Sequence, residues 1–386
     1  MAKIFENISV KEHNSFSTDV VARKFVEFSS FEDLRDTLTS GRSLIEGNWY
    51  LLGGGNNTLF TKDFDGVLIH PASQGIQTEN ENSDHVIIRA EAGVEWDDLV
   101  AWSVERGYWG LENLSIIPGQ VGAAPVQNIG AYGAEAKDTI LSVEMLDTLS
   151  MSKITLDNAA CQFAYRHSIF KHFSSVRMAG MVGNTEKVEN TEKAGNTEQT
   201  GNMEQVERTK QSTTTQDVEK EIIPIITSVR FRLSKTPQPN LHYGALTTEV
   251  KKLGGPSLKN IRQAVINIRE SKLPDPKVLG NAGSFFKNPV VATSLAERLK
   301  SQWPDMPTYS TNNEQETKLA AGWLIEQSGW KGRSLGNAAV HDKQALVLVN
   351  KTGKASGQEI ITLAGEVVRS VKEKFGVEIT PEVNIL

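Results

Sequence analysis

The stretch with the clearest capacity for chemistry is residues 280–289, which reads Gly-Asn-Ala-Gly-Ser-Phe-Phe-Lys-Asn-Pro. The glycines let the backbone approach a ligand and place the hydroxyl of Ser284 on a turn. Phe285 and Phe286 can exclude water behind that hydroxyl, and the lysine and asparagine that follow add a cation and an amide. Two core phenylalanines beneath a glycine turn would give the same pattern without any chemistry, so the stretch alone decides nothing.

Two glycine-rich stretches further upstream suit a ligand that carries phosphate. Residues 53–57, Gly-Gly-Gly-Asn-Asn, directly follow the apolar run 49–52, which predicts a strand ending in bare backbone N–H groups. The pattern is neither a P-loop nor Gly-x-Gly-x-x-Gly. Residues 115–133 hold four glycines, two prolines and no charged side chain. A surface loop would carry more charge, so we favour an extended backbone wrapped around a large ligand.

A single arginine among aromatic side chains is the next candidate. Residues 163–171 read Phe-Ala-Tyr-Arg-His-Ser-Ile-Phe-Lys and centre on Arg166. A guanidinium group stacks on aromatic rings and also binds carboxylates with two parallel hydrogen bonds. Arg166 is therefore either a stacked structural residue or an anion clamp, and the residues alone favour neither.

The whole-chain totals narrow the class of protein. At 386 residues the chain is long enough for two or three domains, and its net charge of −6 gives no electrostatic case for nucleic acid or anionic membranes. Cys161 is the only cysteine, so no internal disulfide can form. The N-terminus has no apolar signal-like core, and no run approaches the roughly 20 apolar residues of a membrane span. We expect a cytoplasmic monomer that acts on small molecules and has no metal site.

Hydrophobic periodicity predicts the elements that must position these residues. Helices are expected near residues 31–38, 96–106, 258–272, 319–327 and 360–375, and strands near 49–52, 66–70, 85–91, 140–146, 229–233 and 345–350. Residues 1–30 show no strong period. Residues from about 178 to 220 form a degenerate polar repeat with almost nothing to bury, which predicts disorder. A short solenoid is the alternative, but no repeat unit carries an apolar face.

Taken in order, these stretches resemble the UDP-N-acetylenolpyruvoylglucosamine reductase (MurB) family of bacterial flavoproteins, over nearly the whole chain apart from residues 174–222. The resemblance rests on the two glycine-rich stretches, Tyr165-Arg166, residues 283–289 and the terminal Pro381-Glu382-Val383. The segment with Tyr243-Gly244 is similar to the tyrosine-bearing loop of the longer, type I branch. The polar insert departs from the family pattern.

The resemblance implies an α+β fold. Its FAD-binding part has two lobes, of the PCMH/VAO flavoprotein type, and is followed by a C-terminal α/β substrate-binding domain. The first lobe would span residues 1–65 with 380–386. The second would span 66–274, interrupted by the insert, and the third part would span 275–379. The proline pair Pro274 and Pro276 marks the last boundary.

The resemblance also implies a reaction, in which UDP-N-acetylglucosamine enolpyruvate is reduced to UDP-N-acetylmuramate for peptidoglycan precursor synthesis. FAD would be the cofactor and NADPH the co-substrate. Arg166 and Glu382 would stabilise the developing enolate, and Ser284 would donate the proton. The cation beside Ser284 would be Lys272 or Lys287, and the choice stays open.

Further residues match family positions that contact ligands. The expected substrate or nicotinamide contacts are Tyr132, Tyr165, Tyr243, Lys272, Asn288, Lys331 and Gln344. The expected FAD contacts are Gly53, Gly54, Gly55, Asn56, Asn57, Ser115, Pro118, Gly119, Gly122, Ala123, Gln127, Asn128 and Gly130.

Two other readings compete with the reductase. An alcohol or amine oxidase with the same flavin fold would need neither the serine donor nor the Arg–Glu pair, and a flavin or nucleotide carrier would use only the glycine stretches.

Overall fold

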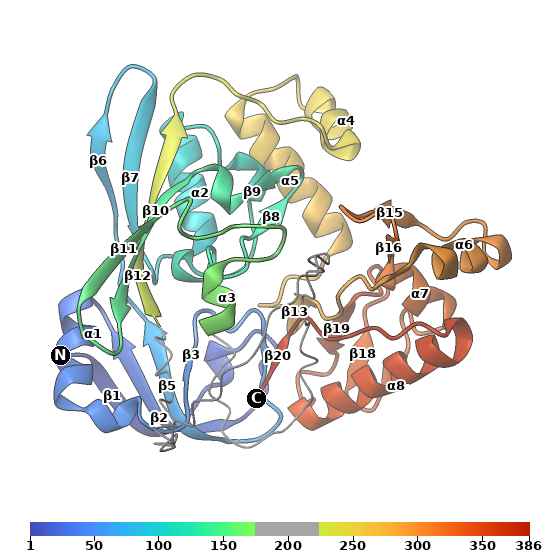
Figure 1. Cartoon of the computed structure of the whole chain (residues 1–386), viewed down its shortest axis with the longest axis horizontal. Coiled ribbons are helices and arrows are strands. Elements are labelled where there is room, and N and C mark those ends of the chain that lie inside the picture. The colour runs from blue at the N-terminus through green and yellow to red at the C-terminus, as the bar shows by residue number, and fades with distance from the viewer. Residues whose placement is uncertain (174–223) are drawn as a thin grey trace, which may run out of the picture.

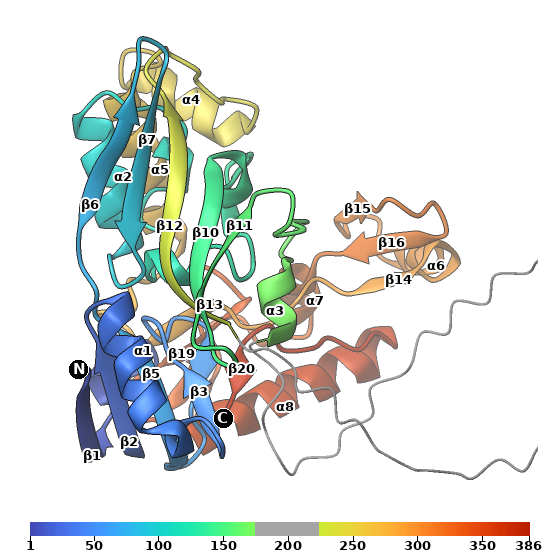
Figure 2. The same cartoon turned by 60° about the vertical axis from the view of Figure 1, so that its left-hand side comes forward.

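The computed structural model describes residues 1–173 and 224–386, and it arranges them as two lobes with a third part beside them (Figures 1 and 2). The predicted disorder of residues 178–220 lies outside the described residues. Helices and sheets are mixed without a regular βα alternation, so the expected α+β class is confirmed.

The first lobe is a four-stranded sheet in the order β1-β2-β5-β3, with helix α1 packed against it. Its elements are β1 (Lys3–Ser9), β2 (Val21–Phe28), α1 (Phe31–Ser40), β3 (Trp49–Leu51) and β5 (Phe64–Pro71). The expected boundary at residue 65 falls inside β5, which pairs in parallel with β2 up to Pro71 and with β3 up to Ile69. Strand β1 escapes prediction because it is an edge strand exposed over nearly its whole length.

The second lobe is an antiparallel five-stranded sheet in the order β11-β10-β12-β7-β6, covered by helices (Figure 2). Its strands are β6 (Ile76–Glu81), β7 (His85–Glu91), β10 (Ile140–Asp147), β11 (Lys153–Asp157) and β12 (Pro224–Ser234). Its helices are α2 (Trp96–Glu105), α4 (Gly244–Lys252) and α5 (Leu258–Lys272). The predicted helices and strands of this lobe are confirmed, since apolar residues such as Trp96 and Phe231 meet between sheet and helices.

The third part holds two small antiparallel sheets and three helices. The sheet that carries Ser284 has the order β13-β19-β18-β17, with β13 (Asn281–Ser284), β17 (Ser334–Leu335), β18 (Ala338–Val340) and β19 (Val347–Asn350). The other elements are β14 (Val290–Ala292), α6 (Thr293–Gln302), β15 (Thr308–Ser310), β16 (Glu316–Leu319), α7 (Ala321–Gln327) and α8 (Gly357–Phe375). The helix expected from residue 319 begins at Ala321, because Leu319 pairs with Thr308 in the second sheet.

The third part and the first lobe share structure. Strand β20 (Asn384–Ile385), at the end of the chain, pairs in parallel with β4 (Thr58–Leu59). Phe16 and Leu59 of the first lobe are fully buried in the hydrophobic core of the third part. The first glycine-rich stretch and the C-terminus are therefore held together. Among the described residues, no helix is both long enough and apolar enough to cross a membrane.

Candidate active site

The two glycine-rich stretches lie against each other. A Cβ atom added to Gly54 would lie 3.5 Å from the Cα of Gly119, and one added to Gly53 would lie 3.7 Å from the Cβ of Ala123. Residues from two lobes thus form one surface with little side chain on it. Bare backbone of this kind lets a large cofactor approach closely.

Several expected cofactor residues shape this surface through internal contacts. A Cβ on Gly55, whose φ is 63°, would lie 2.2 Å from the carbonyl oxygen of His13, and one on Gly122 would lie 2.7 Å from the Cβ of Ala92. The hydroxyl of Ser115 donates to the carbonyl oxygen of a neighbouring residue at 2.6 Å. These residues fix the path of the backbone.

The remaining expected cofactor residues differ in what they can offer. The amide of Asn56 donates to its own turn at Gly54 O, 3.0 Å away, and the amide of Asn57 donates to Glu382 O at 3.4 Å. Asn128 is buried and donates to Ala164 O at 3.0 Å, which ties it to the segment carrying Arg166. Gly130 pairs with residue 135 of a short hairpin, Pro118 is exposed and Gln127 is half-buried.

Two buried acceptors, one in the second stretch and one just before it, fit FAD. Asn113 Oδ1 and Gln120 Oε1 have no hydrogen-bond partner among the described residues. Their amide nitrogens are used, since Asn113 donates to Tyr132 O at 2.9 Å and Gln120 to Pro71 O at 3.3 Å. Buried acceptors are nearly always satisfied, so these two oxygens suit a ligand rich in N–H and O–H donors. FAD has both kinds of donor.

Four of the eight non-glycine residues with positive φ in the described part of the chain lie in the same segments. Ile116, Asn128, Tyr132 and Arg166 all have positive φ, between 44° and 53°. L-residues rarely adopt such values, and strained residues persist only where the surroundings hold them. All four lie in the stretches that the sequence singles out for ligand binding.

Ser284 and Glu382 are neighbours through backbone hydrogen bonds. Ser284 is the exposed last residue of β13, opposite Val347 of β19. The next residue, Phe285, accepts a 2.8 Å hydrogen bond from the backbone N–H of Glu382. Because Glu382 also receives the side chain of Asn57, one strip of chain joins the serine, the glutamate and the first glycine-rich stretch.

Arg166 joins this group through Lys171, in α3 (Ile169–Phe173). The ammonium group of Lys171 donates to the carbonyl oxygen of Arg166 at 3.0 Å. Burial lowers the pKa of Lys171, the charges of Lys287 and Arg166 lower it further, and Glu382 opposes them. These groups therefore share one electrostatic environment. The sequence alone does not single out Lys171, although it lies in the same aromatic-rich segment.

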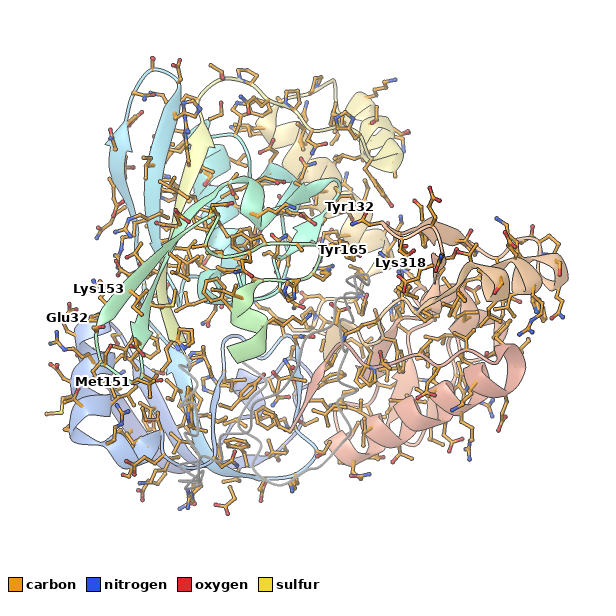
Figure 3. All side chains as sticks on the ribbon, viewed as in Figure 1. Glu32, Tyr132, Met151, Lys153, Tyr165 and Lys318 are labelled. Atoms are coloured by element: carbon orange, nitrogen blue, oxygen red, sulfur yellow. The ribbon has the colours of Figure 1, made fainter. Side chains whose placement is uncertain are left out.

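The expected tyrosines line two sides of the same region. The rings of Tyr132 and Tyr243 meet edge to face, with centroids 5.3 Å apart. Tyr165 is 67% exposed, and the ammonium group of Lys318 lies 4.4 Å from its ring centroid. Figure 3 shows Tyr132 and Tyr165 on the second lobe, on the side toward Lys318 of the third part. The sequence gives no reason to choose Lys318, because only the fold brings β16 to this place.

Arg269 of α5 is a further cation that the sequence does not single out. Its Nε is buried without a hydrogen-bond partner among the described residues. Burial lowers the pKa of its guanidinium group, Tyr132 and Asp97 oppose that change, and Arg166 adds to it. A buried cation with an unfilled donor suits an anionic ligand. Its position one helical turn before Lys272 is the only sequence signal that points to it.

The side chains of the other expected substrate residues have no hydrogen bond or ion pair, among the described residues, with the side chains named above. Asn288 Oδ1 accepts from Ala321 N at the start of α7, at 2.9 Å, which leaves the amide nitrogen of Asn288 to contact a ligand. Gln344 Oε1 accepts from the backbone N–H two residues later, at 3.3 Å. Lys331 is ion-paired with Glu326 at 2.9 Å. Lys272 is exposed in the last turn of α5.

Comparisons with known proteins point to one family. A family model described as the C-terminal domain of UDP-N-acetylenolpyruvoylglucosamine reductase matches residues 275–386, and an FAD binding domain model matches residues 23–150. The UDP-N-acetylenolpyruvoylglucosamine reductase of Bacteroides fragilis (strain YCH46) is 42% identical over 381 residues, which is 99% of each chain. That of Flavobacterium johnsoniae is 39% identical over 387 residues, the whole of both chains.

A solved structure shares the fold. The crystal structure of the enzyme of the same name from Thermus caldophilus superposes with a TM-score of 0.60 at 18% identity, covering 100% of this chain and 98% of that one. Both glycine-rich stretches lie wholly within the matched FAD binding domain, and Ser284 and Glu382 lie within the matched C-terminal domain. The chain therefore belongs to the UDP-N-acetylenolpyruvoylglucosamine reductase family of FAD-binding enzymes.

Proposed function

We propose that this protein reduces UDP-N-acetylglucosamine enolpyruvate to UDP-N-acetylmuramate with NADPH, as a cytoplasmic monomer in peptidoglycan precursor synthesis. The observation that carries the proposal is the 2.8 Å hydrogen bond between Glu382 N and Phe285 O, which brings the backbone of Glu382 next to the residue after Ser284, while Asn57 of the first glycine-rich stretch donates to Glu382 O. FAD, when bound, supplies a hydride carrier between NADPH and the enolpyruvyl methylene carbon.

Arg166 and its neighbours stabilise the negative charge that develops on the substrate. Reduction of the methylene carbon places charge on the adjacent carbon, and that charge spreads into the carboxylate. A guanidinium fork matches a carboxylate with two hydrogen bonds, and charge stabilisation of this kind is usually the largest catalytic contribution. Lys171 holds the carbonyl of Arg166, and Arg269 adds a second guanidinium group nearby.

Ser284 delivers the proton. Its hydroxyl is protonated at neutral pH, and a strongly basic enolate can take that proton when a cation supports the alkoxide. Phe285 and Phe286 are almost completely buried behind it and keep water from that side. Lys272 and Lys287 are the two candidate cations.

The uridine diphosphate part of the substrate would meet tyrosines and cations on both sides of the site. Tyr132, Tyr165 and Tyr243 offer rings and hydroxyls, and lysines offer point charges for phosphate. The amides of Asn288 and Gln344, together with Lys331, complete the proposed contacts.

The test begins with purified protein. We expect a yellow protein with a flavin absorption spectrum that oxidises NADPH only when UDP-N-acetylglucosamine enolpyruvate is present. Ser284→Ala should still bind FAD and should still be reduced by NADPH, while substrate reduction falls by orders of magnitude. Absence of flavin, or rapid turnover with oxygen and a small alcohol, would overturn the proposal. Normal turnover by Ser284→Ala would overturn the assignment of the proton donor.

A double-variant measurement separates the two lysines. Lys272→Met and Lys287→Met are each made alone and in the Ser284→Ala background. Replacing the lysine that supports the alkoxide should lower kcat strongly when Ser284 is present and hardly at all in the Ser284→Ala background, because its partner is gone there. Replacing a lysine that only binds phosphate should raise KM in both backgrounds.

A further inference from the structure

The loop that contains Ser15 and Phe16 touches both halves of the proposed chemistry. On one side, the backbone N–H and the hydroxyl of Ser15 both donate to the carbonyl oxygen of Gly55, at 3.3 and 3.1 Å. On the other side, the carbonyl oxygen of Ser15 accepts from the backbone N–H of Asn281 at 2.8 Å. One residue thus bridges the middle of the first glycine-rich stretch and the first residue of the strand that ends in Ser284.

Phe16 extends the bridge into the third part. Its carbonyl oxygen accepts a 2.9 Å hydrogen bond from the buried amide of Asn350, whose backbone N–H donates to Gly280 O at 2.8 Å. Its ring is fully buried, with its centroid 6.2 Å from that of Phe285 in an edge-to-face contact. Phe16 therefore supports both ends of the segment from Gly280 to Phe285.

The loop lies so close to the backbones at Gly55 and Gly280 that it cannot shift against either of them. A Cβ on Gly280 would lie 2.5 Å from the carbonyl oxygen of Phe16, and a Cβ on Gly55 would lie 2.2 Å from that of His13. Two glycines, one on each side, allow the loop to lie directly on both backbones. Contact this tight transmits displacement, because a packed interior has few voids to absorb it.

The loop itself is stiff. The side chain of Asn14 is buried and donates to the carbonyl oxygens of Val10 and Thr18, at 2.8 and 3.1 Å. Its oxygen accepts from both the backbone N–H and the hydroxyl of Thr18, at 3.0 and 3.1 Å. This network fixes the two ends of the loop to each other, so the loop acts as a solid spacer.

We propose that Ser15 and Phe16 form a brace that couples occupation of the FAD site to the position of Ser284. Phe16 is then a positioning residue, since it acts through the 280–285 segment. The last link is internal to that segment, where the side chain of Asn281 accepts from Gly283 N at 2.9 Å, directly before Ser284. The inference rests on the proposed role of Ser284, but the coupling can be measured without any turnover.

Hydrogen exchange of the protein with and without FAD tests the coupling directly. In the unaltered protein, FAD binding should slow amide exchange in a peptide covering residues 280–288 by at least about tenfold. In Phe16→Ala this slowing should be lost, although FAD still protects the peptide covering residues 53–57. Phe64→Ala is the matched control, because Phe64 is buried in the first lobe but belongs to a different hydrophobic cluster. Protection of residues 280–288 that is the same in Phe16→Ala and in the unaltered protein would overturn the brace.

A kinetic cycle tests the consequence for the reaction. Phe16→Ala should slow substrate reduction by about 100-fold, the cost of misplacing a reacting group by about 1 Å, while reduction of the bound flavin by NADPH stays near normal. In the Ser284→Ala background, Phe16→Ala should cost less than about threefold, because the residue it positions is gone. Equal losses in both backgrounds would overturn the brace.

Two further variants keep these outcomes separate from simple unfolding. Phe16→Leu keeps most of the buried volume and should restore most of the rate and of the exchange protection. Asn350→Asp removes the donor to Phe16 O and should reproduce the loss if it folds. If Ser284→Ala alone has no effect, the proton-donor assignment fails, and the hydrogen-exchange result still decides the brace.

Discussion

Ile116 adopts a backbone conformation that a β-branched side chain strongly disfavours, with a φ of 50°. It persists because Asp97 accepts a 2.6 Å hydrogen bond from its backbone N–H. Arg262 completes the arrangement with two hydrogen bonds to the same carboxylate, at 2.6 and 2.8 Å. Residues of α2 and α5 thus hold the start of the second glycine-rich stretch in a strained backbone conformation.

Asp97→Asn should therefore weaken both the fold and FAD binding. The variant keeps an acceptor for Ile116 but leaves Arg262 without its charge partner, which we expect to cost about 2 kcal/mol of unfolding free energy. Denaturant titration measures the loss of stability, and flavin fluorescence measures the loss of affinity. The neighbouring Asp98→Asn serves as the control and should leave both unchanged.

The same carboxylate predicts a pH dependence. Burial alone would raise the pKa of Asp97, but hydrogen bonds from Arg262 and Ile116 lower it below its ordinary value of 3.8. A lowered pKa stabilises the folded protein at pH values above the ordinary pKa, and that contribution disappears as the pH falls through the folded-state pKa. Between about pH 5 and pH 3, the unaltered protein should therefore lose more stability than Asp97→Asn. Parallel acid-denaturation curves for the two proteins would contradict this.

Arg269→Met should separate stability from function. The buried guanidinium group has an unfilled donor, so an apolar side chain of similar length should raise the unfolding free energy of the ligand-free protein by about 1 kcal/mol. The same change should raise KM for the UDP-sugar about tenfold or more, because a hydrogen bond to a charged group is lost. Thermal melting and steady-state kinetics check the two effects. A lower melting temperature with unchanged KM would show a purely structural arginine.

At the scale of elements, α8 is the clearest case of local sequence setting local structure. Ser356 and Glu359 form a reciprocal capping box at its start, and Gly376 ends it in the left-handed conformation. Between them, Ile360, Val367 and Val371 lie on one face and are fully buried. The helix supports the sheet that carries Ser284 without contributing a catalytic group.

Ser356→Ala should cost about 1 kcal/mol of stability, because the backbone N–H of Glu359 loses its acceptor. The flavin spectrum and KM should not change. Thr362→Ala is a suitable control, since the Thr362 hydroxyl bonds only to its own helix, at Gln358 O, and its removal should be nearly neutral. A loss of flavin in Ser356→Ala would show that α8 influences the site more directly.

At the scale of the whole molecule, the three parts form one interlocked body. The chain begins and ends in the first lobe, and Phe16 and Leu59 from that lobe complete the core of the third part. A chain truncated after residue 274 would therefore leave apolar surface uncovered on the first lobe. The proposed catalytic group is likewise shared, with Arg166 from the second lobe and Ser284 from the third part.

The polar insert should be dispensable. The described chain stops at Phe173 and resumes at Pro224, and the residues between are rich in Asn, Thr, Glu and Gly. Replacing residues 178–220 by a short Gly-Ser linker should change the unfolding free energy by no more than about 1 kcal/mol, because closure entropy depends weakly on loop length. Thermal melting and NADPH oxidation measure the outcome. A large fall in either would show that the segment packs or binds.

The elements predicted correctly are those whose burial is set by their own residues. Helix α5 shows an apolar face through Leu258, Ile261, Val265 and Ile268. Strand β12 buries Val229, Phe231 and Leu233, while Arg230 and Arg232 between them are more exposed. Strand β1 has no such face, because pairing with β2 alone defines it. The boundary expected at residue 65 falls inside β5 for the same reason, since membership of a sheet depends on partners elsewhere in the chain.

For the site, local sequence determined which segments would carry chemistry, because glycine runs, an arginine among aromatic residues and a Gly-Ser-Phe-Phe turn are features of residues next to one another. Only the tertiary structure decided which of them meet. Ser284 and Glu382 are about a hundred residues apart, and backbone hydrogen bonds from Glu382 to Phe285 and from Lys287 to Thr380 bring their segments together. Lys318 and Phe16 carry no local signal, and Lys171 and Arg269 carry only their closeness in sequence to Arg166 and Lys272, because the importance of all four lies in partners that folding brings to them.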